Sequence, residues 1–312
     1  MALLAEYALT PDVFDGTSYS STEICGVHLQ TLKDVLLQEG LVRNLWNGEW
    51  AKTIIGNERP WHPRGKELLK KLVIQNRLTS FPAIRPSFPD NDAFWCEEAL
   101  ASHGVIPLNG IIVTECISGS FNNQPLVAPV QKLPTTTWWS NRSPSLRLLR
   151  NLTDYRAALN LVLKNANSIL FIDPHLDPCR LQYRDFGKLL EVAGSRTPPP
   201  MIEVHRVCYR GSGSQRQILN LTEIEGWFRN NLFGTLRQVG LKMEVFVWDD
   251  FHDRYLISDL VGISLANGFD TTTSPNAKTT WTRLGRADRD DIQREFDPAS
   301  NRHVLRGKLL IS

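Results

Sequence analysis

The chain has 312 residues, of which 42% are hydrophobic and 22% charged, a composition typical of globular proteins. Its 35 basic and 33 acidic side chains leave a formal net charge of +2, which excludes a strong global attraction to nucleic acid or to an anionic membrane. Any such binding must come from a local patch. The five cysteines include no CxxC pair, which favours reduced thiols over a disulfide framework or a zinc knuckle. Residues 1–10 lack the signal-peptide pattern, and no apolar stretch reaches the roughly 18 residues of a spanning helix, so we expect a cytoplasmic protein.

Residues 1–140 are predicted to form a mainly helical domain. Apolar side chains recur at helical spacing over 17–40, 64–76 and 91–102, whereas 110–114 has the pattern of a short buried strand. Between residues 121 and 144, prolines alternate with Asn, Ser and Thr, which indicates a Pro-rich linker and a domain boundary. Residues 1–140 resemble no family that we recognise.

Residues 150–312 are predicted to form an α/β domain with a mixed sheet flanked by helices, because strand and helix patterns alternate. Strands are predicted over 168–172, 202–207, 242–248, 254–257, 262–266 and 305–311. Helices are predicted over 152–166, 184–193, 222–239 and 289–296.

The segment that begins at His252 is the most informative part of this half. It follows the apolar strand 242–248, and His252 and Arg254 are two positions apart, so in an extended strand they would point to the same face. An imidazole can attack phosphorus or move a proton, and a guanidinium can hold non-bridging phosphate oxygens. The pair therefore indicates a phosphodiester site. The alternative is a structural pair, with Arg254 bridging Asp253 or Asp259.

The order His252, Arg254, Asp259 resembles the H-x-K-x4-D signature of the phospholipase D superfamily. In that family the histidine is the nucleophile, the lysine binds phosphate, and the aspartate supports the structure and the histidine. The resemblance thus implies a catalytic group of these three residues. Arg254 departs from the lysine of catalytic members and would bind phosphate as a planar fork. The substrate-binding side chains that we expect around them are Asp253, Ser264, Asn267 and His175. Gly262 and Ser264, with Asn267, match the family's Gly-Ser-x-Asn poorly.

A closer resemblance is to the phospholipase D-like C-terminal domain of MIT-domain proteins, and it covers residues 150–312. That branch also has His-Asp-Arg at this site, a strand that ends in Asp-Pro, and a later Gly-Leu-Asp. Here the corresponding residues are Asp173 and Pro174, and the run 268–270. The branch is thought to bind membranes without cutting phosphodiesters, which lowers the expectation of an enzyme.

The resemblance leads to two hypotheses. The first hypothesis is a metal-independent phosphodiesterase or nuclease that acts through His252 without a cofactor. It would be a homodimer, because catalysis in the superfamily needs two motifs and this chain has one. Its substrate would be nucleic acid rather than lipid. The second is an inactive scaffold that binds nucleic acid, phospholipid or a protein. By analogy such scaffolds serve in bacterial defence systems, with residues 1–140 contacting the protein partner.

Three other features have a functional and a structural interpretation. His175 follows a strand end, where α/β sites tend to lie, but a loop histidine fits too, and Asp173 fits a turn-former before Pro174. The loop 211–214, with Arg206, Arg210 and Arg216 around it, is either a phosphate cradle or a flexible solvated loop. Trp138 and Trp139 form either an aromatic-basic patch or a contact that holds the linker to its domain.

Overall fold

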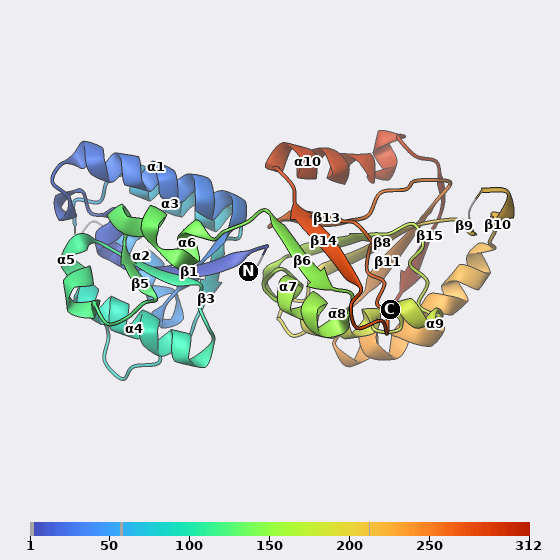
Figure 1. Ribbon diagram of the computed structural model, residues 1–312, viewed down its shortest axis with the longest axis horizontal. Helices are drawn as coiled ribbons and strands as arrows, with labels where there is room; N and C mark the ends of the chain where they lie inside the picture. Colours follow the sequence, from blue (N-terminus) through green and yellow to red (C-terminus); the bar gives the residue numbers. More distant parts are fainter. Residues whose placement is uncertain (1–2, 57–58, 212) are drawn as a thin grey trace. The chain divides into compact units, whose positions relative to one another are not determined.

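The computed structural model describes residues 3–56, 59–211 and 213–312. The chain divides into two compact units, Leu4–Arg142 and Ser143–Ser312, the latter together with Leu3. The division falls within residues 121–144, where the sequence places the boundary. Both units are mixed α/β structures (Figure 1). In the described part of the chain, no helix is both long and apolar enough to cross a membrane.

The N-terminal unit is built on a parallel sheet whose described strands lie in the order β3-β2-β1-β4-β5. The strands are β1 Ala5–Leu9, β2 Gly40–Asn44, β3 Leu78–Ser80, β4 Gly110–Val113 and β5 Val127–Pro129. The helices are α1 Thr22–Glu39, α2 Glu49–Ile55, α3 Pro63–Ile74, α4 Asp92–Val105, α5 Glu115–Ser118 and α6 Thr137–Ser140. In Figure 1, α1 and α3 cover one face of the sheet and α4 the other. The central strands are therefore buried on both faces, as parallel strands generally are.

This arrangement corrects two predictions. The N-terminal unit is not a mainly helical domain with one strand, because short buried strands such as β1 have no alternating pattern that would distinguish them from helix segments. The segment 121–144 is not a linker, because β5 completes the sheet beside β4. Trp139 is buried with its ring centroid 5.5 Å from that of Tyr7, so it holds this segment to the unit.

The C-terminal unit contains a mixed sheet in the order β15-β11-β8-β7-β12-β13-β14-β6. The strands are β6 Ser145–Leu149, β7 Ser168–Ile172, β8 Met201–Val207, β11 Met243–Trp248, β12 Tyr255–Ser258, β13 Gly262–Leu265, β14 Lys278–Arg283 and β15 Leu305–Ile311. Strands β7, β8 and β11 are parallel to one another, and the other pairings are antiparallel. The prediction of one mixed sheet here is confirmed, although β6 and β14 were not predicted.

Helices cover both faces of this sheet. They are α7 Leu152–Asn165, α8 Phe186–Ala193, α9 Leu221–Gln238 and α10 Arg286–Glu295. Figure 1 shows α7, α8 and α9 on one face and α10 on the other. A short ribbon of β9 Tyr209–Arg210 and β10 Gln217–Ile218 follows β8. The carboxyl ends of β7 and β8 consequently lie side by side, and the loops that leave them face the same space.

Candidate functional site

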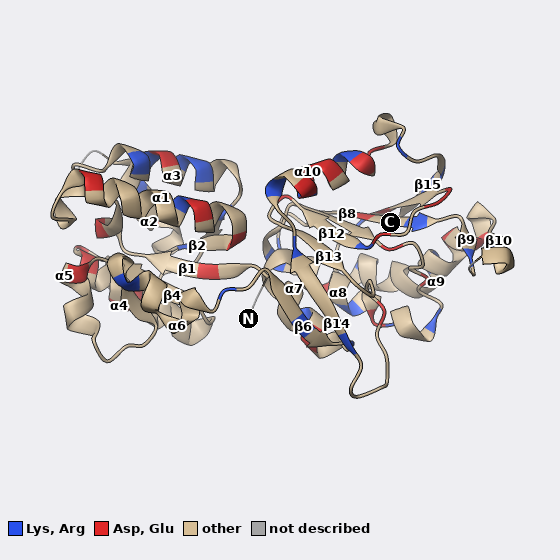
Figure 2. Ribbon diagram, turned by 45° about the horizontal axis from the view of Figure 1, so that its top comes forward, with Lys and Arg blue, Asp and Glu red and all other residues tan. Residues whose placement is uncertain are grey.

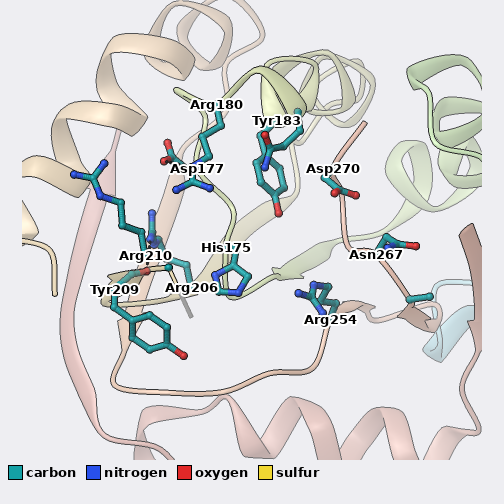
Figure 3. Close-up of a pocket in the computed structure, with 13 residues that line it drawn as sticks. His175, Asp177, Arg180, Tyr183, Arg206, Tyr209, Arg210, Arg254, Asn267 and Asp270 are labelled. Atoms are coloured by element: carbon teal, nitrogen blue, oxygen red, sulfur yellow. Dashed lines mark hydrogen bonds and ion pairs between the residues drawn. The ribbon is translucent and has the colours of Figure 1, made fainter. Parts of the chain in front are cut away.

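A cavity of about 370 Å³ lies at the carboxyl ends of β7 and β8 (Figure 3). Its walls come from the loop after β7, the end of β8, the β9 ribbon, the segment before β12 and the loop after β13. The lining residues are His175, Asp177, Arg180, Gln182, Tyr183, Arg206, Tyr209, Arg210, Gly211, Arg254, Ala266, Asn267 and Asp270. The set is predominantly polar and contains several arginines, which is typical of a site for a charged ligand.

Asp173 organises one wall of the cavity. This fully buried carboxylate accepts hydrogen bonds from the backbone nitrogens of His175 and Phe269, each at 3.1 Å, and from the Tyr183 hydroxyl at 3.2 and 3.3 Å. The Arg254 Nε lies 3.8 Å from the Asp173 Oδ1. Burial raises the pKa of Asp173 to about 6, although these hydrogen bonds and Arg254 act in the opposite direction.

The loop after β13 can approach this carboxylate only because of a glycine. Gly268 has a φ of +71°, a left-handed conformation that residues with a Cβ rarely adopt. A Cβ at this position would also overlap with the Asp173 carboxylate. Gly268 therefore allows the Phe269 backbone nitrogen to reach Asp173, and this brings Asn267 and Asp270 to the cavity.

Arg206 supplies a buried positive charge. Its side chain is 1% exposed, and Nε, Nη1 and Nη2 donate to the carbonyl oxygens of Val207, Leu176 and Tyr209. Burial lowers its pKa only to about 10, so the guanidinium remains charged at neutral pH. In the described part of the chain no carboxylate forms an ion pair with Arg206.

The other arginines of the cavity each lie near a carboxylate. Arg180 is 3.4 Å from Asp177, and Arg210 is 3.6 Å from Glu223. Arg254 faces Asp173, as described above. The remaining lining carboxylate, Asp270, pairs with Arg150 outside the cavity. Among the described residues, each of these other cavity arginines thus has a carboxylate nearby. The positive charge of the buried Arg206 is the one left without such a pair. An anion in the cavity would compensate it.

His175 lies within this group of cations. In Figure 3 its imidazole lies between the side chains of Arg206 and Arg254. Burial lowers the pKa of His175, and the charges of Arg254, Arg206, Arg180 and His252 lower it further. The neutral imidazole is therefore the form at physiological pH, and it can accept a proton or a hydrogen bond.

The structure separates the residues of the His-x-Arg motif. Residues 251–254 precede β12 and have no regular secondary structure, so the two-residue alternation of a strand does not apply to them. Arg254 enters the cavity, whereas His252 and Asp253 are exposed and do not belong to its lining. Arg254 Nη1 donates a hydrogen bond to the backbone oxygen of His252, at 3.4 Å, and not to its side chain. The expectation that the two side chains share one face of a strand is thus wrong.

Asp259 lies at the other end of β12 from Arg254. Its carboxylate accepts hydrogen bonds from the backbone nitrogen of Asn167 at 2.9 Å and from the side-chain amide of the same residue at 3.2 Å. It therefore fixes the start of β7 and does not support His252. Ser264, in the middle strand of the β12–β13–β14 meander, also lies outside the cavity lining.

Of the predicted residues, Arg254, His175 and Asn267 line the cavity. Arg206 and Arg210 also line it together with Gly211, whereas Arg216, the third arginine predicted around the loop 211–214, lies outside the lining and pairs with Asp250 at 3.0 Å. Ser212 of that loop lies outside the described residues. Sequence reasoning missed Arg180, Asp177 and Tyr183, which carry no motif signal. The sequence assigned Asp173 to a turn before Pro174, and its hydrogen bond from the His175 backbone nitrogen confirms that role. Asp173 also organises a wall of the cavity, which the sequence did not indicate.

Neither a protein-family model nor a curated protein matches the chain. One solved structure retrieved by similarity is that of TrmBL2, an archaeal chromatin protein whose structure shows a novel mode of DNA binding. It shares 13% sequence identity, covers 76% of this chain and 80% of its own, and gives a TM-score of 0.31. This similarity is too low to support an inference about the present chain. In the described part of the chain, no three His, Cys, Asp or Glu side chains are grouped so as to hold a metal ion.

Proposed function

We propose that the C-terminal unit is a phospholipase D-like module that binds a phosphodiester anion in the cavity around Arg206. The observation that carries the proposal is a buried guanidinium that is charged at neutral pH, lines a cavity, and has no carboxylate within ion-pair distance in the described chain. A phosphodiester carries one negative charge, which matches this surplus. Arg254 is partly exposed and can hold the non-bridging oxygens from the opposite side.

The lining favours nucleic acid over the whole of a lipid. It contains no Leu, Ile, Val, Met or Phe side chain among the described residues, so nothing there would hold an acyl chain. Gln182, Asn267 and Asp270 instead offer amides and a carboxylate that can bond sugar hydroxyls or base edges. We therefore propose a single-stranded nucleic-acid segment as ligand, with one phosphate in the cavity. A homodimer and a protein partner of the N-terminal unit stay predictions.

Recognition is better supported than hydrolysis through His252. His252 is exposed and is not among the residues that line the cavity, whereas a nucleophile must contact the phosphorus that it attacks. The position of His252 therefore favours the binding part of the second hypothesis drawn from the sequence, an inactive scaffold, over a nucleophile at His252.

The test is the affinity of the full chain for a short, fluorescently labelled single-stranded oligonucleotide, measured by anisotropy at low salt. Removing the partly exposed guanidinium in Arg254→Ala should weaken binding about 10- to 100-fold, since hydrogen bonds to charged groups contribute roughly 1.5–3 kcal/mol. Arg254→Lys should retain part of the affinity, because it keeps the charge and loses the fork.

The matched control is Arg294→Ala. Arg294 lies on α10, where acidic and basic side chains are interspersed (Figure 2), and its side chain is 68% exposed. Loss of this charge should change affinity less than 3-fold, roughly what a rim charge contributes. Equal weakening by both variants would show a diffuse electrostatic attraction and contradict a site at Arg254. No binding by the unmodified chain would refute the proposal.

A further inference from the structure

His175 lines the cavity and is anchored through its backbone. It follows β7 directly after Asp173 and Pro174, and its backbone nitrogen donates to the Asp173 Oδ1 at 3.1 Å. The ring centroid lies 6.4 Å from that of Tyr209 on the β9 ribbon. The backbone of His175 is thus fixed beside β7, and its imidazole lines the cavity between Arg206 and Arg254.

The charges that face this imidazole favour its neutral form. Arg180 approaches from the loop after β7, Arg206 from β8, and Arg254 with His252 from the segment before β12. The carboxylates nearby are engaged elsewhere. Asp177 pairs with Arg180, and Asp173 accepts backbone and tyrosine hydrogens. The neighbouring Tyr183 and Tyr209 hydroxyls donate to Asp173 and Asp250.

A neutral imidazole between two guanidinium groups is an arrangement suited to hydrolysis. If Arg206 and Arg254 hold the non-bridging oxygens of a diester, His175 lies beside phosphorus, where a water molecule would have to attack. The two cations would stabilise the additional negative charge that develops on these oxygens. A base at this position needs a free ring nitrogen, and none of the hydrogen bonds found in the described structure engages the ring of His175.

We propose that His175 is the catalytic base of a phosphodiester hydrolysis completed within one chain, an inference that rests on the proposed binding of a phosphodiester at Arg206 and Arg254. The ring nitrogen takes a proton from water as the water oxygen bonds to phosphorus. The bond from phosphorus to the leaving oxygen breaks on the opposite side of phosphorus. That oxygen takes a proton from solvent water, and the imidazolium releases its proton to the solvent. The products are a phosphomonoester and an alcohol, water is the only other reactant, and no bond forms between phosphorus and histidine.

This mechanism differs from the one expected from the sequence in two measurable ways. The base belongs to the same chain and solvent water supplies the proton of the leaving oxygen, so neither a second chain nor His252 is required. The specific activity of the full chain should therefore be independent of protein concentration, including concentrations at which size-exclusion chromatography with light scattering shows a monomer. Rapid acid quench during turnover of a 32P-labelled oligonucleotide should yield no phosphohistidine.

The test compares three variants on bis(p-nitrophenyl) phosphate and on a single-stranded oligonucleotide. His175→Ala should lower kcat about 100-fold or more, the usual contribution of general acid–base catalysis. Its affinity for the oligonucleotide should change less than 3-fold, and its melting temperature should show that it is folded. His252→Ala should keep kcat within 3-fold of the unmodified chain at neutral pH. His175→Gln, which cannot take a proton but can still accept a hydrogen bond, should be as inactive as His175→Ala.

The pH profile gives a second readout. Because activity requires the neutral ring and the pKa of His175 is lowered, kcat should fall only as the pH drops below the ordinary histidine value of 6.5. Loss of kcat in His252→Ala with retention in His175→Ala would overturn the inference. Oligonucleotide binding without hydrolysis by the unmodified chain would also overturn it while leaving the recognition site intact. Absence of binding would remove the proposed function itself.

Discussion

Asp173→Ala should destabilise the C-terminal unit by about 3 kcal/mol at pH 7, because each buried donor that loses its acceptor costs roughly 1–3 kcal/mol. Three donors would lose their acceptor: the backbone nitrogens of His175 and Phe269 and the hydroxyl of Tyr183. All three converge on a fully buried carboxylate, so water cannot replace it without opening the cavity wall. Urea unfolding gives the free-energy change, and hydrogen exchange of the β7 and β12 amides assigns it to this unit.

The loss of unfolding free energy caused by Asp173→Ala should grow as the pH falls. Burial raises the pKa of Asp173 from 3.8 to about 6, so between these values the folded chain holds a proton that the unfolded chain has released. The stabilisation from this proton is complete below about pH 4 and is lost as the pH rises through 6. The shift corresponds to about 3 kcal/mol, so the difference between the unmodified chain and Asp173→Ala should be larger at pH 4 than at pH 7 by an amount of this order.

Asp288→Ala is the control, since Asp288 is an exposed residue in the first turn of α10. Its loss should cost less than about 1 kcal/mol, the usual contribution of a charge near a helix terminus. If the two variants had similar stabilities at pH 7, Asp173 would not organise the cavity wall.

The sequence predicts the C-terminal sheet well for a physical reason. Strands β7 and β11 are mainly apolar, and β8 has apolar residues at the alternate positions Ile202 and Val204. Each of the three strands lies between recognisable helices. Strands β6 and β14 were missed because Ser, Thr, Arg and Lys interrupt their apolar positions. In the antiparallel part of a sheet one face can stay polar, and so weak a pattern does not stand out from loops.

The N-terminal sheet was missed because charge partners are not visible in sequence. Strand β1 carries Glu6 as its second residue, which interrupts an otherwise apolar run and argues against a buried strand. In the structure Glu6 is 5% exposed and pairs with Arg43 of the neighbouring strand β2. Both side chains look like surface residues until the fold brings the two strands together.

In the candidate site, too, the sequence does not reveal contacts that form only on folding. His175 and Arg254 were identified by their positions beside strands, and both line the cavity. His252 was misplaced because the motif suggested a strand that begins only at Tyr255. Arg206 was considered as part of a phosphate cradle, but its burial could not be predicted, because an arginine within a strand becomes a buried cation only through the carbonyl oxygens that converge on it after folding.

Arg43→Met should destabilise the N-terminal unit by about 3–5 kcal/mol, the usual effect of removing one partner of a buried ion pair. Arg43 is fully buried, and its Nε and Nη2 lie 3.1 and 2.8 Å from the Glu6 carboxylate oxygens. Nη1 also donates to the carbonyl oxygens of Ser102 and Ile106, and the guanidinium lies over the Phe81 ring. Without it, the Glu6 carboxylate keeps a side-chain hydrogen bond from Thr79 but loses the opposite charge that compensates its burial.

The destabilisation caused by Arg43→Met should depend on whether Glu6 is charged. This dependence distinguishes a buried ion pair from simple packing. In the double variant Glu6→Gln with Arg43→Met no unpaired charge remains, so the chain should regain part of the stability lost in Arg43→Met. A coupling free energy between the two sites above about 1 kcal/mol is expected from a double-mutant cycle. Lys33→Met is the control, since Lys33 pairs with the exposed Glu67 at 3.1 Å, and its loss should cost less than about 1 kcal/mol. Additive effects of Glu6→Gln and Arg43→Met would mean that the two buried charges act on stability independently, and would contradict a stabilising ion pair between them.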